Sequence, residues 1–424
     1  MTSASPAAAN RRITTLAGVR SIHAAFRWLQ LHEPRLRQWQ REFLAIPAPP
    51  FAEVARAQWF ASSFLDLDLN NVHLDAEGNA LAELPAAAAA DNAPIILLSA
   101  HLDTVFPAGT PCTPRDEESR ILCPGAADNG AGLTALLALA AALKSAAILP
   151  ACTILFAANV GEEGEGDLRG MKHLFTVSPY APRIRAVIAL EGAGTSTVVD
   201  RALGSRRLRV EITGPGGHSW ADFGRPSPIT ALAEALAAIA HLPLPANPRT
   251  TLNCGLISGG TSINSIPSAA QADLDLRSLS TEELDHLEQA VLKTLSKSVQ
   301  AEARRSHTRN ALRLREALRV REALRVTARR IGDRTAGALP HDSALFTSLR
   351  AVDRHLGLTT EPRVGSTDAN LPLSLGIPAL AIGSGGAAGG IHTLDEWHDP
   401  THRHLALRRI LLLLLDTCSL TLTS

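Results

Sequence analysis

Three short runs of consecutive apolar residues, each followed by acidic residues or histidine, constrain the fold of this chain most strongly. They cover residues 93–100, 153–160 and 184–190. Such runs, without polar alternation, are typical of strands buried on both faces of a sheet. The helical apolar stretch 133–144 lies between the first two runs. Alternating strands and helices predict an α/β domain with a mixed, mostly parallel sheet covered by helices.

Polar side chains stand directly after these runs, at the expected carboxyl ends of the strands. His101 and Asp103 follow the first run, Glu162 and Glu163 the second, and Glu191 the third. Ligands of open α/β sheets bind outside the carboxyl ends of the strands. We therefore expect the chemistry of the protein at this edge of the sheet.

The pattern changes near residue 203, and a chain of 424 residues is long enough for two hydrophobic cores. Residues 206–213 alternate like a half-exposed strand, and shorter helices and strands follow. We expect a small α/β sandwich of the ferredoxin-like type at residues 204–330. It would be inserted into a larger domain formed by residues 1–203 plus 331–424.

The hexapeptide REALRV occurs twice in succession over residues 315–326. A shift of six residues is even, so in a strand it preserves which side chains face inward. The composition favours a helix. We interpret the repeat as a strand lengthened by duplication.

The bulk composition argues against several classes of partner. The 41 lysines and arginines equal the 41 aspartates and glutamates, so no net field attracts nucleic acid or an anionic membrane. The apolar tail 410–415 is too short to span a bilayer, and the stretch 13–19 is too short for a secretory signal. Five scattered cysteines without a CxxC pair indicate reduced thiols and a cytoplasmic protein.

Imidazole and carboxylate side chains on the expected loops suit zinc. Asp128 lies in the flexible turn 125–132, from which a short carboxylate can reach two ions; the alternative is a helix N-cap. The adjacent Glu162 and Glu163 can diverge, one binding metal while the other accepts a proton. The alternative for this pair is a solvated acidic loop.

Six motifs, in this order along the chain, resemble the di-zinc metallopeptidase family of aminoacylase, glutamate carboxypeptidase, succinyl-diaminopimelate desuccinylase and peptidase T. The resemblance spans roughly residues 46–397. The motifs are SAHLDT at 99–104, GAADNGAG at 125–132, Glu162–Glu163, LEG at 190–192, GPGGHS at 214–219 and IHTLDE at 391–396.

The resemblance implies two divalent metal ions, zinc in the first place and cobalt or manganese as alternatives. His101, Asp128 and Glu191 would hold one ion. Asp128, Glu163 and His392 would hold the other, so that Asp128 bridges the pair. The larger domain would thus be the metal-binding catalytic domain.

The resemblance also implies roles outside the metal ligands. Asp103 would orient a histidine ligand, and Glu162 would be the general base that takes a proton from the attacking water. The inserted domain would act as a lid and dimerisation domain. In it, His218 would stabilise the oxyanion, in its own subunit or the partner's, while Asn264 and Arg277 would bind substrate.

These features together predict a metal-dependent hydrolase that cleaves small peptides or N-acyl amino acids, in the manner of a carboxypeptidase or aminoacylase. Glu191 resembles the glutamate of family members with these activities, and Arg277 suits a free carboxylate on the product. The alternative is a di- or tripeptide aminopeptidase resembling peptidase T. A catalytically silent binding protein is a third reading, although no base or ligand is missing from the set.

Overall fold

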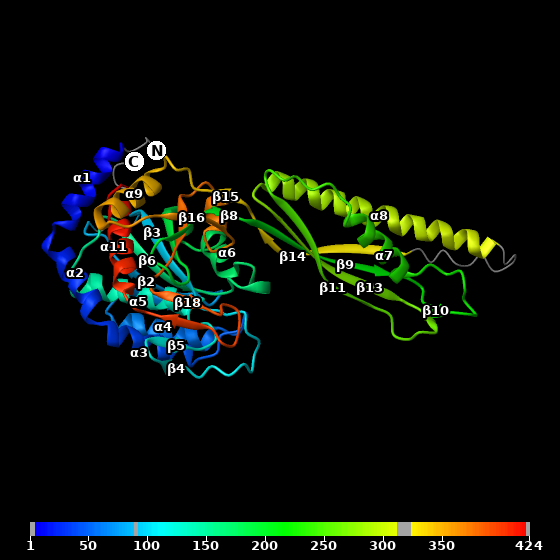
Figure 1. Ribbon diagram of the computed structural model, residues 1–424, viewed down its shortest axis with the longest axis horizontal. Helices are drawn as coiled ribbons and strands as arrows, with labels where there is room; N and C mark the ends of the chain where they lie inside the picture. Colours follow the sequence, from blue (N-terminus) through cyan, green and yellow to red (C-terminus); the bar gives the residue numbers. More distant parts are fainter. Residues whose placement is uncertain (1–4, 89–91, 312–323, 421–424) are drawn as a thin grey trace. The chain divides into compact units, whose positions relative to one another are not determined.

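The computed structural model describes residues 5–88, 92–311 and 324–420, which divide into two compact units (Figure 1). The first unit comprises Met1–Ala202 and Ala338–Ser424, and the second comprises Leu203–Gly337. The second unit therefore extends beyond the expected end at residue 330. The last long strand of this unit, β14 (Arg325–Arg334), completes its sheet, so the boundary between the units lies after this strand.

A nine-stranded mixed sheet forms the centre of the first unit, in the order β1-β2-β6-β3-β7-β17-β8-β15, with β16 paired to β8. The pairs β6–β3, β3–β7 and β7–β17 are parallel, which confirms the expected fold class. The strands are β1 Asn70–Leu74, β2 Ala80–Leu84, β3 Ile95–His101, β6 Thr153–Asn159, β7 Ile184–Leu190, β8 Thr197–Ala202, β15 Gly337–Ala338, β16 Glu361–Gly365 and β17 Ala379–Ile382.

Helices cover this sheet, and α4, α5 and α11 pack directly against its strands. Residues 130–143 of α5 are all buried, because this helix is apolar on every side and lies inside the unit. The helices of the unit are α1 Pro6–Ala17, α2 Arg20–Leu31, α3 Glu33–Leu44, α4 Val54–Asp66, α5 Gly130–Ser145, α6 Arg169–Thr176, α9 Ala344–Leu356, α10 Asn370–Ser374 and α11 Arg403–Leu420, with short 3-10 turns at Gly164–Gly166 and Ala181–Arg183.

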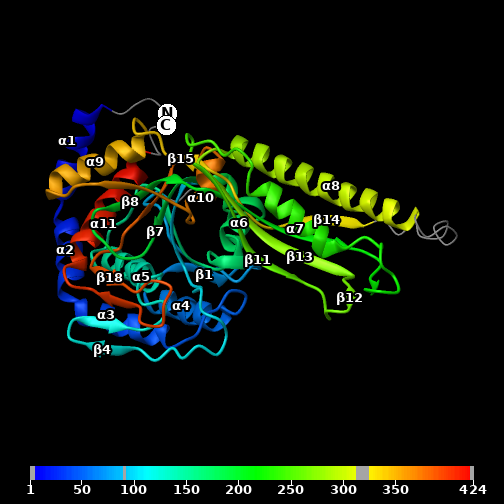
Figure 2. The ribbon, with the colours of Figure 1, turned by 45° about the vertical axis from the view of Figure 1, so that its right-hand side comes forward.

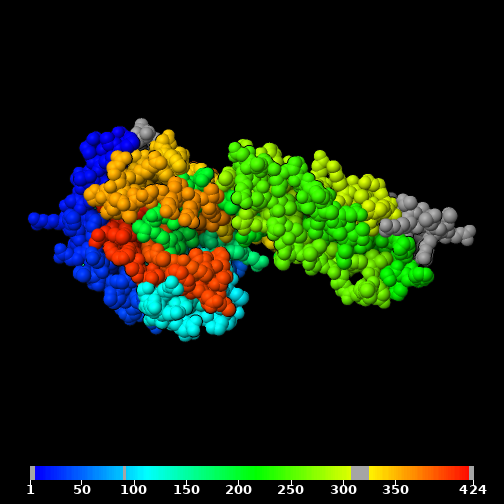
Figure 3. All heavy atoms as spheres, in the orientation of Figure 1, coloured from blue at the N-terminus to red at the C-terminus, as the bar shows by residue number. Residues whose placement is uncertain are grey.

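A second, small sheet of the first unit joins two distant parts of the chain. It consists of β18 (Ala387–Gly389), β19 (Trp397–Asp399), β5 (Arg120–Leu122) and β4 (Arg115–Glu117), in that order. In Figure 3 the cyan surface of the β4–β5 segment lies beside the orange-red surface of the β18–β19 segment. This pairing brings the loop that carries His392 back to the first half of the unit.

The second unit has the order strand, helix, strand, strand, helix, strand along the chain, and its sheet order is β11-β13-β9-β14 with antiparallel pairs. This is the ferredoxin-like arrangement. Helices α7 and α8 pack on the sheet (Figure 2), and alternate residues of β13 are buried beneath them. The elements are β9 Gly204–Thr213, β10 Gly217–His218, α7 Pro228–Ile239, β11 Thr250–Gly259, β12 Ser265–Ile266, β13 Ala269–Ser278, α8 Thr281–Ala311 and β14.

Most of the REALRV duplication lies outside the described residues, so the strand interpretation of the repeat stays a prediction. Only its last three residues are described: Leu324 is buried, and β14 begins at Arg325. Within the described ranges, none of the helices combines the length and the apolar character that crossing a membrane requires.

Candidate metal centre

Three neighbouring parallel strands bring the chemistry to one edge of the central sheet. His101 is the last residue of β3 and pairs with Asn159, the last residue of β6. The turn that carries Glu162 and Glu163 follows β6 after two residues, and Glu191 follows β7 directly. Because β6, β3 and β7 are adjacent and run in the same direction, their polar ends meet.

The turn before α5 supplies Asp128 to the same edge. Asn129, and not Asp128, is the N-cap of α5: its Oδ1 accepts a hydrogen bond from Gly132 N at 3.1 Å. The cap interpretation of Asp128 is therefore wrong, and its carboxylate is left for other partners. A Cβ atom at Gly132 would lie 2.6 Å from Leu190 O, so only glycine allows α5 to approach β7 this closely.

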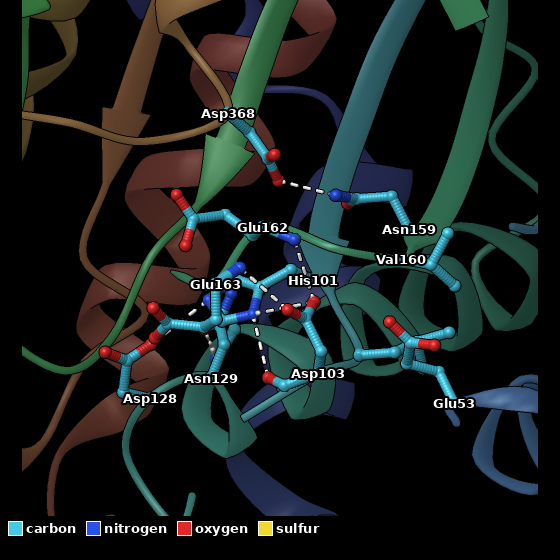
Figure 4. Close-up of polar contacts among 12 residues, drawn as sticks. Glu53, His101, Asp103, Asp128, Asn129, Asn159, Val160, Glu162, Glu163 and Asp368 are labelled. Carbon is cyan, nitrogen blue, oxygen red and sulfur yellow. Dashed lines mark hydrogen bonds and ion pairs between the residues drawn. The ribbon is translucent and has the colours of Figure 1, made fainter. Parts of the chain in front are cut away.

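The two oxygens of Asp128 contact two different histidines, and Figure 4 shows Asp128 close to Glu163 and His101. Asp128 Oδ1 lies 3.1 Å from His101 Nε2, which lies 3.5 Å from Glu191 Oε1. Asp128 Oδ2 lies 3.1 Å from His392 Nε2, which lies 3.2 Å from Glu163 Oε1. The Asp128 carboxylate thus joins the His101–Glu191 contact at one oxygen to the His392–Glu163 contact at the other.

These side chains fit divalent cations. Donor atoms of His101, Asp128 and Glu163 lie within 4.8 Å of one another. Ligands about 2.0–2.1 Å from a tetrahedral ion are separated by roughly 3.3 Å, close to the separations found here. Glu191 Oε2 is buried and has no hydrogen-bond partner in the described part of the chain. The nitrogen His101 Nδ1 donates to Asp103 O at 3.0 Å, which leaves the Nε2 lone pair for an ion.

The carboxylates of the cluster lie close together, which raises the pKa values of two of them. A bound cation would reduce the repulsion between these charges. Burial, together with the neighbouring Glu162 and Asp128 charges, raises the pKa of Glu163 to about 8. Burial raises the pKa of Glu191 to about 7, against the opposing effect of His101. The hydrogen bond to Asp128 and the charge of Glu163 raise the pKa of His392 to about 9. Without a cation, protons balance part of the negative charge.

Asp103 has a second role that the sequence does not reveal. Besides its contact with His101, its carboxylate accepts hydrogen bonds from Glu162 N at 2.9 Å and Glu163 N at 2.7 Å. Asp103 is fully buried, and burial alone would raise its pKa, but the hydrogen bonds with His101 and these amides lower it. Asp103 therefore positions the histidine through its backbone oxygen and the acidic turn through its carboxylate.

Glu162 is buried and lies within electrostatic reach of the cluster. After burial, its charge is the largest cause that raises the pKa of Glu163 and of Asp368, the latter to about 8. Asp368 is itself fully buried and accepts a hydrogen bond from Asn159 Nδ2 at 2.8 Å (Figure 4). The charge of Glu162 thus acts on the cluster from a buried position.

Two supporting residues escaped the sequence reasoning. Glu396 accepts hydrogen bonds from Ala127 N at 2.8 Å and Asp128 N at 2.9 Å, which fixes the Asp128 turn. Asn129 donates to Leu190 O at 2.8 Å and accepts from Gly192 N at 3.1 Å, which joins that turn to the Glu191 segment. In the sequence, the two residues are marked only by their place in the motifs GAADNGAG and IHTLDE, each of which contains a proposed metal ligand.

In the second unit, the structure brings His218 and Asn264 together. Strands β10 and β12 pair, and Ser219 N donates to Asn264 O at 2.9 Å. His218 Nδ1 accepts hydrogen bonds from the backbone N–H groups of Trp220 and Ala221 at 3.1 and 3.2 Å. The neutral imidazole must then carry its proton on Nε2, where it can be donated outward.

Arg277 lies in the four-stranded sheet of the unit, near the carboxyl end of β13, whereas β10 and β12 form a separate two-stranded sheet. It pairs with Ser205 and Thr251 in the ladders, eight residues along β13 from Ala269. At roughly 3.3 Å per residue, Arg277 is about 26 Å along the strand from Ala269, the end of β13 that follows β12 in the chain. Its Nε donates to Asp275 Oδ2 at 2.7 Å in an ion pair, while its two terminal nitrogens have no partner among the described residues.

The chain matches the model of a known protein family, described as "Peptidase family M20/M25/M40", over residues 97–416. Among curated proteins it is 32% identical over 207 residues to a probable carboxypeptidase of Aspergillus clavatus, covering 44% of this chain and 45% of the fungal protein. The alignment thus spans about half of the length of that relative.

Solved structures share the fold. An aminopeptidase, PepT, of Bacillus cereus superimposes with a TM-score of 0.69 at 21% identity, covering 91% of this chain and 98% of that one. A tripeptidase of Staphylococcus aureus gives a TM-score of 0.70 at 20% identity, covering 91% and 99%. At these identities the likeness establishes the architecture alone.

Proposed function

The chain belongs to peptidase family M20/M25/M40, and from this premise we propose that it is a metal-dependent hydrolase of small peptides or N-acyl amino acids. The observation that carries the proposal is the shared carboxylate: each oxygen of Asp128 faces its own histidine and glutamate. This arrangement supports a site for two divalent ions, which would be zinc in the first place, with cobalt or manganese as alternatives.

His101, Asp128 and Glu191 would hold one ion, and Asp128, Glu163 and His392 the other. When bound, the ions would polarise the scissile carbonyl and make the attacking water more acidic. Asp103 would keep His101 in the tautomer that presents Nε2 to an ion, through the Nδ1–H bond to its backbone oxygen.

Glu162 would be the general base. Its backbone is fixed by Asp103, and the side chain is buried, with a charge that raises the pKa of Glu163. It would accept a proton from the attacking water at a carboxylate oxygen and then deliver that proton to the leaving amine nitrogen.

His218 and Asn264 would stabilise the oxygen of the attacked carbonyl. His218 presents an Nε2–H because its Nδ1 is an acceptor. The Ser262 hydroxyl donates to Asn264 Oδ1 at 2.6 Å, which leaves the Asn264 amide N–H groups for a ligand. Two outward donors on one short element suit a developing oxyanion.

The site would be shared between two subunits of a homodimer. His218 and Asn264 lie at the β10–β12 pair, which precedes β13 in the chain, and Arg277 lies about 26 Å along β13 from the first residue of that strand, Ala269. This length is too great for one small substrate to reach both ends. If all three contact substrate, Arg277 must come from one chain and the pair from another. Edge strand β11, with exposed Leu256 and Ile257, offers the surface on which two copies could pair.

The substrate would carry a free carboxylate, which the free terminal nitrogens of Arg277 suit. The curated relative named as a probable carboxypeptidase supports this choice. A di- or tripeptide aminopeptidase is the second candidate, since the turn before α5 resembles that of peptidase T. All five cysteines are described and unbridged, in line with a cytoplasmic location.

Hydrolysis of a small panel by the purified protein tests the proposal: N-acetyl amino acids, dipeptides with free or blocked N-termini, and tripeptides. We expect zinc-dependent cleavage that is lost in Glu162→Gln, which keeps the shape of the side chain but accepts no proton. Preference for blocked N-termini would favour the carboxypeptidase or acylase reading, and a requirement for a free amine the aminopeptidase. Two bound ions without turnover of any compound would favour a binding protein.

A further inference from the structure

Three large apolar side chains are exposed at the β10–β12 end of the second unit. Trp220 is 83% exposed, Phe223 is 64% exposed and Ile263 is fully exposed. Single apolar residues on a surface are ordinary, but a group rimmed by polar residues marks a binding surface. We call Trp220, Phe223 and Ile263 the apolar tip.

The backbone of the apolar tip is held firmly, so the exposure does not follow from a loose turn. Asp222 Oδ2 accepts a hydrogen bond from His218 N at 2.7 Å, and Asp222 N donates to His218 O at 2.9 Å. Arg225 ties the turn back to Gly216 O at 3.1 Å and pairs with Asp222 at 3.2 Å. Gly217 has a φ of 149° and packs against Asp222, where a Cβ atom would meet the carboxylate at 2.8 Å.

The apolar tip and the two outward donors belong to one hydrogen-bonded element. Trp220 stands two residues after His218 and bonds to its ring through the backbone. Ile263 stands directly before Asn264, whose backbone oxygen accepts from Ser219 N. Apolar surface with a few convergent polar groups is the composition of a small-molecule site.

We propose that Trp220 and Ile263 are specificity-determining residues that contact the substrate side chain next to the scissile carbonyl, so that substrates with apolar or aromatic side chains are preferred. This inference rests on the proposed function, which puts His218 and Asn264 on that carbonyl oxygen. A second copy of the chain is a less suitable occupant of the tip. The edge of β11 offers a second copy a whole unpaired strand with Leu256 and Ile257, whereas the tip offers two short turns.

The experiment measures kcat/KM of the zinc-loaded, full-length protein on one substrate series that differs only in a single side chain: glycine, alanine, leucine, phenylalanine, aspartate and lysine. We expect Trp220→Ala and Ile263→Ala to lower kcat/KM for the leucine and phenylalanine members about tenfold, and for the glycine member less than about twofold. Trp220→Phe should restore most of the loss. Leu149→Ala, a truncation of a 70% exposed side chain of the first unit, should change no member of the series.

Other outcomes separate the two levels of the proposal. An equal loss on every substrate would overturn the specificity role while leaving the proposed hydrolase intact, provided Glu162→Gln is inactive. A change of molecular mass in solution on Trp220→Ala would also overturn it, since the tip would then be a subunit contact. Full activity of both Glu162→Gln and His218→Ala would instead reject the proposed function itself.

Discussion

Asp128 presents one carboxylate oxygen to His101 and the other to His392, and Asp103 divides its contacts between His101 and the amides of the acidic turn. Single short carboxylates thus link segments that are far apart in the chain. The links to His101 and to the acidic turn are buried or partly buried, where hydrogen bonds to charged groups are strong and expensive to lose. The site is consequently most sensitive to changes that alter charge without altering shape.

Replacing Asp103 by asparagine tests its positioning role. The amide retains one oxygen for the Glu162 or Glu163 N–H but turns an NH2 group toward the other, so the acidic turn loses a charged acceptor. We expect zinc affinity to fall about 10- to 100-fold, as for other supporting groups of metal ligands. Calorimetric titration of zinc measures the loss. Glu165→Gln, at an exposed carboxylate of the same loop, is the matched control and should bind zinc like the unaltered protein.

Zinc binding should tighten with rising pH. The pKa values of Glu191, Glu163 and His392 are raised to about 7, 8 and 9, so near neutral pH Glu163 and His392 are mostly protonated and Glu191 is partly protonated, and an ion must displace these protons. Affinity should therefore rise from about pH 6 to pH 9, with proton release on binding. Titrations in buffers of different ionisation enthalpy count the released protons. An affinity that is flat over this range would show that these groups are not the ligands.

At the scale of elements, the site depends on how α5 is attached to β7. Asn129 caps the helix, and the same side chain bonds to the backbone on both sides of Glu191. The apolar helix and the strand thereby carry Asp128 and Glu191 in a fixed relation. A cap that also bridges to a strand is worth more than a cap on a free helix end, because its loss leaves buried backbone groups unsatisfied.

Asn129→Ala should therefore destabilise the protein more than the loss of an ordinary cap. The cap contributes about 0.5–2 kcal/mol, and the unsatisfied Leu190 carbonyl about 1–3 kcal/mol, so we expect the free energy of unfolding to fall by roughly 2–4 kcal/mol. Denaturant unfolding of the zinc-free protein measures it. Ser343→Ala removes the N-cap of α9, whose Oγ accepts from Phe346 N alone, and should cost about 1 kcal/mol. Equal losses would contradict the bridging role.

At the scale of the whole molecule, the second unit separates its proposed substrate contacts by the length of β13. His218 and Asn264 stand at one end of β13 and Arg277 at the other. Both ends of this unit can contact the same small substrate only if each end comes from a different chain. The dimer is then a condition for activity and not merely a state of association.

Mixing two inactive variants tests this condition. His218→Ala and Glu162→Gln each remove one component of the site. If His218 serves the partner's site, a mixed dimer contains one site with both residues intact, and random pairing of equal amounts restores about a quarter of the unaltered activity. Mass measurements should show a dimer throughout. A monomeric mass, or a mixture that stays inactive, would contradict the shared site.

The sequence by itself determined the strands, the fold class and the residues of the cluster. Buried parallel strands need unbroken apolar runs, and this requirement is local, so 93–100, 153–160 and 184–190 were found close to their observed bounds. The motifs also supplied His101, Asp128, Glu163, Glu191 and His392, which the fold brings together. Their roles at bound metal remain predictions.

Only the tertiary structure decided how these parts support one another. The bonds from Asp103 to the Glu162–Glu163 turn, from Glu396 to the Asp128 turn and from Asn129 to Leu190 each join segments about 60 or more residues apart. No local pattern encodes such a partner, because it is selected by which strands and turns become neighbours. The same is true of His218 and Asn264: strand pairing brings them together and sets Arg277 at the far end of the sheet.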